Sequence, residues 1–265
     1  MTRSKSPHLG PLAILLAVCT LYWSRVLFTG EALLPGAFLR GFAPFGSDPQ
    51  APWNLLRWDA LGQYYPWRLF AAQQLQSGLI PLWNPHQFAG APFVANGQSA
   101  VFYPLNLPFW LMDVARAFGV SAWLHSLLAC AGTYFLAQRW KMSRAASILS
   151  ALAFGFCGYL TTWVMLPTLA NTASWLPLLI LLFDIAATHE TDDVKPNAAP
   201  GALALFSLVF GCTLLAGHAQ IFIYCGMALA LRAATLPHRL HTFKTLFLGS
   251  LWTVALAAIQ VFPTL

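Results

Sequence analysis

The chain has 265 residues, of which 58% are hydrophobic and only 8% are charged, with a formal net charge of +6. An ordinary soluble domain has about 25% charged residues, so this composition excludes a soluble globular protein and indicates an integral membrane protein. The basic residues are scattered among apolar runs and form no patch, which argues against nucleic-acid binding. The five cysteines stand singly in apolar runs, so neither a disulfide framework nor a zinc site is indicated.

Seven apolar runs have about the length needed to cross a bilayer, which takes roughly 20 residues. They lie at 9–28, 119–138, 145–164, 172–187, 201–217, 219–235 and 245–263. A further apolar stretch, Pro104 to Met112, is too brief to cross and suits a re-entrant or interfacial helix. We therefore expect an all-α, polytopic transmembrane helix bundle of about seven spans with a large first outer loop.

The placement of Lys and Arg predicts the orientation of this bundle, because positive residues near span ends favour the cytoplasmic side. Arg3 and Lys5 precede the first run, and the basic clusters at 139–144 and 232–244 fall on the same side when the spans alternate. The N-terminus is therefore expected inside. The expected regions are 1–28, the cytoplasmic N-terminal end and first transmembrane helix; 29–118, a large extracytoplasmic loop with interfacial helices; and 119–265, the remaining transmembrane helices.

The outer loop contains a segment at 58–106 that is rich in aromatic residues, Asn, Gln and Pro. Irregular backbone beside a membrane is tolerated only where water or protein satisfies its polar groups. The turns at 166–168 and 217–220, and the stretch from Gln260 onward, fall on the same outer face. One face therefore concentrates the polar chemistry, and we expect the functional site there.

Asp59 is the candidate catalytic residue of this segment. An acid held near a membrane surface among aromatic rings such as Trp58 and Tyr64 can act as a general base, or can bind a divalent cation such as Mg²⁺ or Mn²⁺. The alternative is a structural role, either as a helix cap or in a salt bridge to Arg57 or Arg68. The residues alone leave both interpretations open.

Five side chains of the loop offer hydrogen-bonding groups suited to sugar hydroxyls. They are Asn84, His86, Asn96, Gln98 and Asn106. Aromatic faces such as Trp83, Phe88 and Tyr103 could stack on the apolar face of a pyranose ring. The alternative is a rigid, Pro-rich loop whose Asn and Gln side chains satisfy its own backbone. For any single residue this alternative is the better interpretation, whereas for the group we favour a binding surface.

His218 and Gln220 lie in a tight turn between two apolar runs, where polar groups need water or partners. His218 could carry a proton, hold a phosphate or bind a metal, although a lone His is more often structural.

Arg40, Arg57 and Arg68 are the basic groups in the loop's first half. Arg recognises phosphate with two parallel hydrogen bonds, so one of them could hold a lipid-linked phosphate; surface Arg beside lipid head groups is the alternative.

Several of these residues belong to motifs of a known family. The motifs are DALGQYYPW at 59–67, SGLIPLWNP at 77–85, GAPF at 90–93, NGQSAVFYPLN at 96–106, GHAQ at 217–220 with Tyr224, and Gln260 followed by Pro263. In this order they resemble the bacterial YfhO-like membrane proteins. The resemblance covers residues 54–106 and two later motifs.

The resemblance implies a fold and an activity. The family is similar to GT-C-type glycosyltransferases, which take a sugar from a polyprenyl-phosphate donor on the outer face of the membrane. For this chain it implies transfer of a sugar to a cell-envelope glycan or lipid acceptor at the bacterial inner membrane. Asp59 would act as base or metal ligand, and Gln63, Tyr64 and Tyr65 would join the substrate-binding residues. Family members are longer, so the chain is expected to be the N-terminal portion of such a protein.

Two other functions compete with sugar transfer. A lipid or polysaccharide transporter needs charged or polar groups facing one another at mid-membrane, where the apolar runs carry very few. A non-catalytic membrane scaffold would leave Asp59 in a salt bridge far from any cavity. An enzyme is instead expected to bring Asp59, His218 and the polar groups of 84–106 to one outward cavity.

Overall fold

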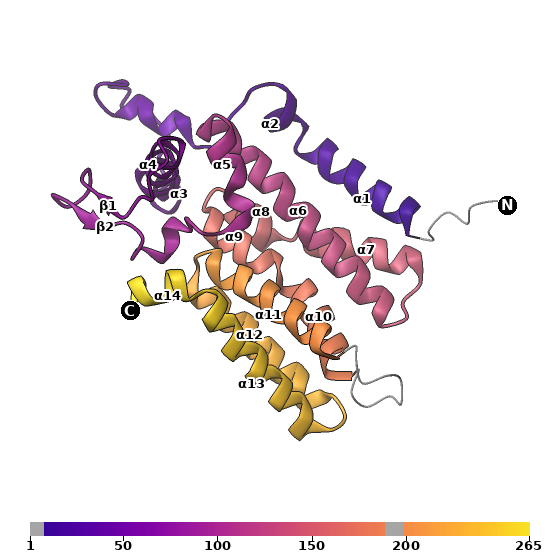
Figure 1. The fold of residues 1–265 in the computed structure, drawn as a ribbon. Coiled ribbons are helices and arrows are strands. Elements are labelled where there is room, and N and C mark those ends of the chain that lie inside the picture. The colour runs from indigo at the N-terminus through magenta and orange to yellow at the C-terminus, as the bar shows by residue number, and fades with distance from the viewer. Residues whose placement is uncertain (1–7, 189–198) are drawn as a thin grey trace.

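The computed structural model describes residues 8–188 and 199–265. Helices make up most of the described chain (Figure 1). The helices in the apolar runs are α1 (Leu9–Tyr22), α2 (Ser24–Phe28), α6 (Val114–Arg139), α7 (Arg144–Gly155), α8 (Gly158–Trp163), α9 (Pro167–Ser174), α10 (Leu176–Thr188), α11 (Ala199–Leu215), α12 (Ala219–Thr235), α13 (Arg239–Leu256) and α14 (Ala258–Thr264).

The outer loop has only short elements. They are the 3₁₀ turns η1 (Gly36–Gly41), η3 (Gly97–Ser99) and η4 (Pro104–Asn106), the helices α3 (Leu55–Asp59), α4 (Tyr65–Gln76) and α5 (Leu107–Leu111), the π-helical turn η2 (Ala60–Tyr64), and the strands β1 (Trp83–Asn84) and β2 (Ala91–Pro92). The two strands pair in antiparallel fashion, with Trp83 opposite Pro92. The stretch predicted to be a short non-spanning helix is η4 followed by α5.

Within residues 8–188 and 199–265, three helical stretches are long and apolar enough to cross a membrane, and a fourth qualifies if α13 and α14, bent by 76° at Ala257, count as one span. The three are Val114–Arg139, Arg144–Trp163 and Pro167–Thr188. The other apolar helices, α1, α11 and α12, are shorter. Helices therefore lie at all seven predicted positions, while the number of spans they make stays a prediction.

Several of the predicted runs are interrupted, which their apolar composition does not reveal. The first run breaks at Trp23, whose indole nitrogen donates to Ser126 Oγ at 2.9 Å across to α6. The fourth run breaks at Trp175, and its first half begins at Pro167, earlier than predicted. Polar side chains at these positions satisfy groups on neighbouring helices, so tertiary contacts help to set where the helices end.

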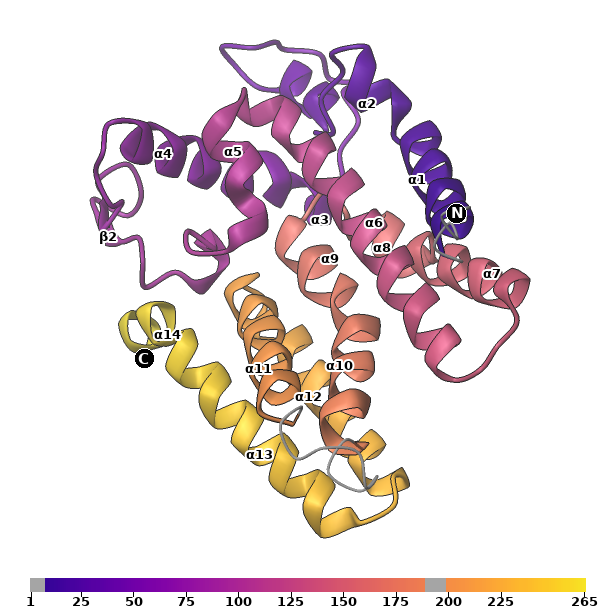
Figure 2. The ribbon, with the colours of Figure 1, turned by 45° about the vertical axis from the view of Figure 1, so that its right-hand side comes forward.

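Helix α6 lies at the centre of the bundle, between α1 and α7 on one side and α9 and α10 on the other (Figures 1 and 2). Gly155 of α7 sits directly against the Cys130 side chain of α6, so a larger residue there would separate the two helices. Phe183 of α10 packs on Phe206 of α11, with ring centroids 5.6 Å apart, and Phe206 stacks in turn with Phe210. Close helix packing at small residues and contacts between aromatic rings stabilise the bundle.

The outer loop forms a lobe at one end of the bundle, where α3, α4, β1 and β2 gather and α14 lies beneath them (Figure 1). Its own apolar cluster includes Tyr64, Trp67 and Phe70 from η2 and α4, packed with Phe93 and Phe109. Phe70 meets Phe93 edge-on at 5.0 Å. The loop is therefore a packed unit joined to the helices.

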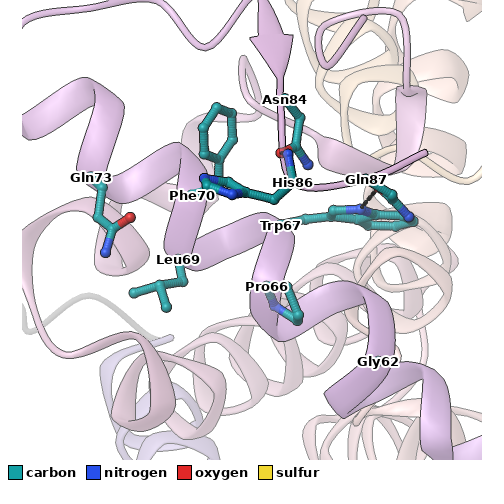
Figure 3. A pocket seen from close by; sticks show the side chains of 9 residues that line it. All are labelled: Gly62, Pro66, Trp67, Leu69, Phe70, Gln73, Asn84, His86 and Gln87. Carbon is teal, nitrogen blue, oxygen red and sulfur yellow. Dashed lines mark hydrogen bonds between the residues drawn. The ribbon is translucent and has the colours of Figure 1, made fainter. Parts of the chain in front are cut away.

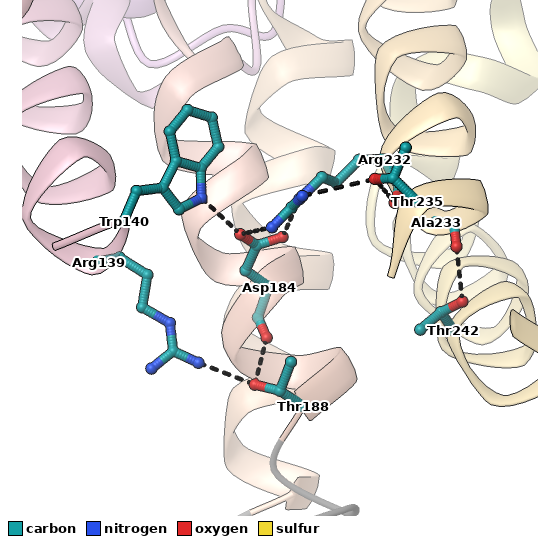
Figure 4. Close-up of polar contacts among 8 residues, drawn as sticks. All are labelled: Arg139, Trp140, Asp184, Thr188, Arg232, Ala233, Thr235 and Thr242. Atoms are coloured by element: carbon teal, nitrogen blue, oxygen red, sulfur yellow. Dashed lines mark hydrogen bonds and ion pairs between the residues drawn. The ribbon is translucent and has the colours of Figure 1, made fainter. Parts of the chain in front are cut away.

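The opposite end of the bundle carries an ion pair between a buried carboxylate and a partly exposed guanidinium, which sequence reasoning did not single out (Figure 4). Asp184 of α10 accepts from Arg232 Nε at 2.7 Å and from Arg232 Nη2 at 2.8 Å, a two-point contact. The indole of Trp140 also donates to Asp184, at 3.1 Å, and Arg232 lies over the Trp140 ring. These residues join the ends of α6, α10 and α12, the side predicted to be cytoplasmic.

Candidate functional site

Asp59 is the last residue of α3 and directly precedes the π-helical turn η2. Its carboxylate accepts a hydrogen bond from Gln63 Nε2 at 2.8 Å, and the side chain is half-buried. The alternative salt bridge to Arg57 or Arg68 is not found among the described residues. Isolated π-helical turns occur frequently at functional sites, because the extra residue re-aims the side chains that follow.

A pocket of about 430 Å³ lies beside α4 in the outer lobe (Figure 3). It is lined by Gly62, Pro66, Trp67, Leu69, Phe70, Gln73, Asn84, His86 and Gln87. The first six come from η2 and α4, with a spacing of three or four residues that places most of them along one side of the helix. The other three come from the last residue of β1 and the turn after it, so the pocket lies between these two segments.

The chemistry of this pocket is aromatic and amide-rich. Trp67 donates its indole N–H to Gln87 Oε1 at 2.9 Å, which fixes both side chains (Figure 3). His86 is exposed and meets the Phe70 ring edge-on at 5.9 Å. Asn84 is buried, and its Oδ1 accepts from the backbone N–H of His86 at 3.0 Å. No Asp, Glu, Lys or Arg lines the pocket, so it suits a ligand of neutral hydroxyl groups with one apolar face.

Asp59 and His218 do not line this pocket. The expectation that Asp59, His218 and the polar groups of 84–106 share one cavity is therefore wrong: of the predicted residues, the pocket contains only Asn84 and His86. Asp59 precedes the first lining residue, Gly62, by three positions, about one helical turn. The carboxylate thus belongs to the same stretch of helix as the pocket, while His218 belongs to another region.

A second group of predicted residues meets where the loop touches the helices. Tyr64 donates its hydroxyl to Gln98 Oε1 at 3.0 Å and accepts from Thr168 Oγ1, 2.8 Å away at the start of α9. Burial raises the pKa of Tyr64, so the phenol stays protonated as this donor role requires. Residues far apart in the sequence therefore meet in one polar junction.

The turn before α12 and the helix α14 close the same junction. Gly217 has a left-handed backbone, with φ of +96°, and a side-chain carbon there would lie 2.6 Å from the carbonyl oxygen of Gly97. Gln260 of α14 donates to the carbonyl oxygen of Val94 at 2.5 Å. The segment 94–100 therefore contacts both the turn before α12 and the helix α14.

Tyr103 links the loop to the interior of the bundle through a directed chain of hydrogen bonds. The Trp175 indole donates to the Tyr103 hydroxyl at 2.8 Å, and that hydroxyl lies 2.7 Å from His125 Nε2. His125 Nδ1 lies 2.7 Å from the backbone carbonyl of Ser121, an acceptor, so Nδ1 carries the proton and Nε2 accepts from Tyr103. Burial raises the pKa of Tyr103 well above its usual range. Tyr103 is thus a structural anchor and does not stack on a ligand.

Replacing Tyr103 by phenylalanine is expected to lower the free energy of unfolding by about 2–3 kcal/mol, because the Trp175 N–H and His125 Nε2 both lose their partner in a buried site. The matched control is Tyr22→Phe, since Tyr22 is exposed and has no hydrogen-bond partner among the described residues. Denaturant unfolding of the purified protein in detergent measures both. Equal stability of the two variants would show that the chain of bonds contributes nothing.

The remaining predicted residues serve local structure. His218 is the N-cap of α12, where its Nδ1 accepts from the Ile221 N–H at 3.3 Å, and burial lowers its pKa, which favours this neutral acceptor form. Asn96 Oδ1 accepts from the Gln98 N–H at 3.1 Å, and Asn106 Nδ2 donates to the Ala100 carbonyl at 2.7 Å. His218, Asn96 and Asn106 therefore have a structural role, because each bonds to a nearby backbone group.

Four further predicted residues are dispersed. Gln220 is exposed and donates to the Tyr224 hydroxyl at 2.6 Å, and the exposed Trp83 ring lies against Gly90. Tyr65 stacks with Phe118 at 6.5 Å. The fourth, Arg57, lines a separate hollow of about 140 Å³ together with side chains of α8 and the turn that follows it. None of the four lines the pocket beside α4.

Sequence reasoning missed most of the pocket lining. Two signals in the sequence could have found them. Gln87 directly follows the predicted residue His86, and the spacing of Pro66, Phe70 and Gln73 places these three on one face of a helix.

No group of three or more His, Cys, Asp or Glu side chains able to hold a metal occurs in the parts of the chain that the structure describes. A divalent cation at Asp59 stays a prediction.

Comparison of the chain with protein families, with curated proteins and with solved structures finds no match. The functional argument therefore depends on the residues and the geometry described above.

Proposed function

We propose that this chain is a membrane glycosyltransferase-like protein of GT-C type. It transfers a sugar from a polyprenyl-phosphate donor to a cell-envelope glycan or lipid acceptor on the outer face of the bacterial inner membrane. In this proposal the seven apolar runs are the spans, and the outer lobe carries the site. The resemblance of the loop motifs to those of YfhO-like proteins suggests the reaction class.

The observation that supports the proposal most is the lining of the pocket beside α4. Its volume of about 430 Å³ falls within the range of roughly 300–1,000 Å³ typical of small-molecule sites. Trp67 and Phe70 offer aromatic faces, and Asn84, His86 and Gln87 offer uncharged hydrogen-bonding groups. This combination recognises a sugar ring, which has an apolar face and a rim of hydroxyls.

Asp59 takes the role of general base or cation ligand in this proposal, because it is the carboxylate next to the pocket-lining stretch of helix. Its bond to Gln63 orients the carboxylate and leaves the second oxygen for an acceptor hydroxyl.

Replacing Asp59 by asparagine is expected to lower the transfer rate by roughly 10²–10⁴-fold, the usual contribution of a general base. Asparagine keeps the size of the side chain and an oxygen for the bond from Gln63. The measurement is incorporation of radiolabel from polyprenyl-phosphate sugars into envelope material by membranes that contain each variant at equal abundance.

The matched control is Asp48→Asn, which removes a partly exposed carboxylate of the same loop that lies 3.8 Å from Arg40 and outside the pocket. It should leave transfer unchanged. Full transfer by the Asp59 variant would contradict the role given to this residue. A loss that is equal in both variants would indicate a general effect of loop charge.

A further inference from the structure

An exposed apolar patch lies in the outer loop, before α3 and at its start. It comprises five large side chains that are between 41% and 71% exposed: Phe42, Phe45, Trp53, Leu55 and Leu56. Single exposed apolar side chains are common on any protein, whereas a group of them on one short segment marks a surface that contacts another molecule or a membrane. We call this group the 42–56 patch.

The rings of the 42–56 patch are held in a fixed arrangement. Phe42 and Trp53 contact each other and the neighbouring Trp58, with ring centroids 5.5, 5.2 and 5.2 Å apart. The turn η2 then leads into α4, whose Arg68 is completely buried and donates to the carbonyl oxygen of Ser99. The patch is therefore a preformed surface on a packed lobe.

The patch lies beside the end of a candidate membrane span. The hollow of about 140 Å³ lies between the start of α3 and the end of α8, with Leu56 and Arg57 on one side and Thr162 and Trp163 on the other. Trp163 is the last residue of the stretch Arg144–Trp163, which is long and apolar enough to cross a membrane. The predicted orientation makes this the outer end. The patch is therefore at the level where that stretch would leave the hydrocarbon layer.

We propose that the 42–56 patch docks on the outer surface of the lipid bilayer beside α8, with its side chains between the head groups and the upper part of the acyl chains. Trp is enriched in this layer because its ring is apolar and its N–H is polar. The patch lies outside the stretch Pro104–Met112, for which the sequence predicts an interfacial helix, and the proposal does not depend on sugar transfer. Docking would hold Asp59, the residue after Trp58, at the membrane surface.

The chemistry of the patch favours lipid over carbohydrate. A carbohydrate needs hydrogen-bonding groups beside the aromatic rings, whereas Phe45, Leu55 and Leu56 are wholly apolar side chains. Lipid would already surround the neighbouring stretch Arg144–Trp163, so these side chains can leave water there without any further partner.

The hairpin of β1 and β2 provides an internal comparison. It also exposes large apolar side chains, among them Leu82 at 65% and Phe88 at 87%, against 71% for Leu55 and 68% for Phe45. The hairpin lies away from α8 in both views of the fold (Figures 1 and 2). A surface that contacts lipid because of its position can therefore be distinguished from one that is merely exposed.

Photo-labelling from lipid tests the docking. The purified full chain is placed in phosphatidylcholine vesicles that contain a photoactivatable phosphatidylcholine, with a diazirine either near the ester group or at the end of the acyl chain. Mass spectrometry then identifies the labelled peptides. The proposal predicts label at 42–56 from the shallow probe, weaker label there from the deep probe, and little label at 79–88 from either. Peptides around Leu149 of α7, which is exposed within a candidate span, are the positive control.

Two matched double variants test the side chains themselves. Phe45→Gln with Leu55→Gln should lower the shallow label at 42–56 by roughly tenfold, the factor for returning about one large apolar side chain to water. Leu82→Gln with Phe88→Gln removes a similarly exposed pair from the hairpin and should leave that label unchanged. All four side chains are exposed, so both variants should fold.

Three results would overturn the proposal. The first is label at 42–56 that is no stronger than label at 79–88, which would indicate that the patch binds a protein or a carbohydrate instead. The second is an unchanged label at 42–56 in the variant of Phe45 and Leu55. The third is an equal loss of that label in the hairpin variant.

Discussion

Replacing Asp184 by asparagine is expected to lower the free energy of unfolding by about 2–3 kcal/mol, because two hydrogen bonds between charged groups weaken. The Arg232 side chain is 27% exposed, so water compensates part of its charge. The substitution leaves the Arg232 guanidinium charged and without its counter-ion at a site where Asp184 is only 3% exposed. It also weakens the contact with the Trp140 indole. Because the three residues join α6, α10 and α12, the loss should loosen that whole end of the bundle (Figure 4).

The measurement is reversible denaturation of the purified variant in detergent micelles. Asp113→Asn is the matched control, because Asp113 is an exposed N-cap and asparagine caps nearly as well. A double variant, Asp184→Leu with Arg232→Leu, should recover much of the lost stability, since replacing both charges removes the uncompensated one. Equal stability of the wild type and Asp184→Asn would show that the pair contributes nothing.

Replacing Gly217 by valine is expected to separate the outer loop from the helices. The left-handed backbone at this position costs a β-branched residue about 1–3 kcal/mol. In addition, the Cβ of the valine would lie 2.6 Å from the Gly97 carbonyl oxygen and 3.2 Å from both Ala100 Cβ and Thr168 Cγ2. The closest of these contacts is with the backbone of Gly97, so the segment around Gly97 has to move away.

Hydrogen exchange followed by mass spectrometry tests this expectation. The Gly217 variant should exchange faster in peptides that cover 94–106, while peptides from α6 keep their protection. Gly158→Val is the control, because a side-chain carbon there meets nothing within 4 Å. Unchanged exchange at 94–106 would mean that the turn before α12 does not hold the loop.

The positions of the helices could be predicted from the sequence, since apolar runs of nearly bilayer length have few other structures open to them. Their interruptions could not. Nothing in the run 9–28 indicates that Trp23 ends a helix by bonding to Ser126, because that contact joins residues 103 positions apart. The bend at Ala257 likewise has no Pro or Gly to mark it.

Only part of the candidate site could be predicted from the sequence, because contacts between distant residues leave no local signal. The polar side chains of 84–106 indicated an unusual region, yet the sequence could not tell which of them face a cavity and which satisfy backbone groups. Asn84 and His86 line the pocket, whereas Asn96 and Asn106 bond to the loop itself. The difference depends on how the loop folds against α4.

The ion pair at the end predicted to be cytoplasmic has a signal in the sequence. Asp184 is the one carboxylate inside any of the seven predicted spans, and an ionisable residue in such a place needs a partner. Arg232 stands near the end of another run. The sequence supplies both residues, but only the fold shows that they meet.

The proposed function requires that the pocket beside α4 holds the transferred sugar. In a photo-crosslinking experiment, a polyprenyl-phosphate sugar with a diazirine on the sugar ring is added to membranes that contain the chain, and the labelled peptides are identified by mass spectrometry. Label is expected within 62–73 and 84–87, and unmodified donor should compete with it. Label confined to the apolar groove of α11 and α13 at 203–208 and 252–256, or no label that the donor competes, would contradict it.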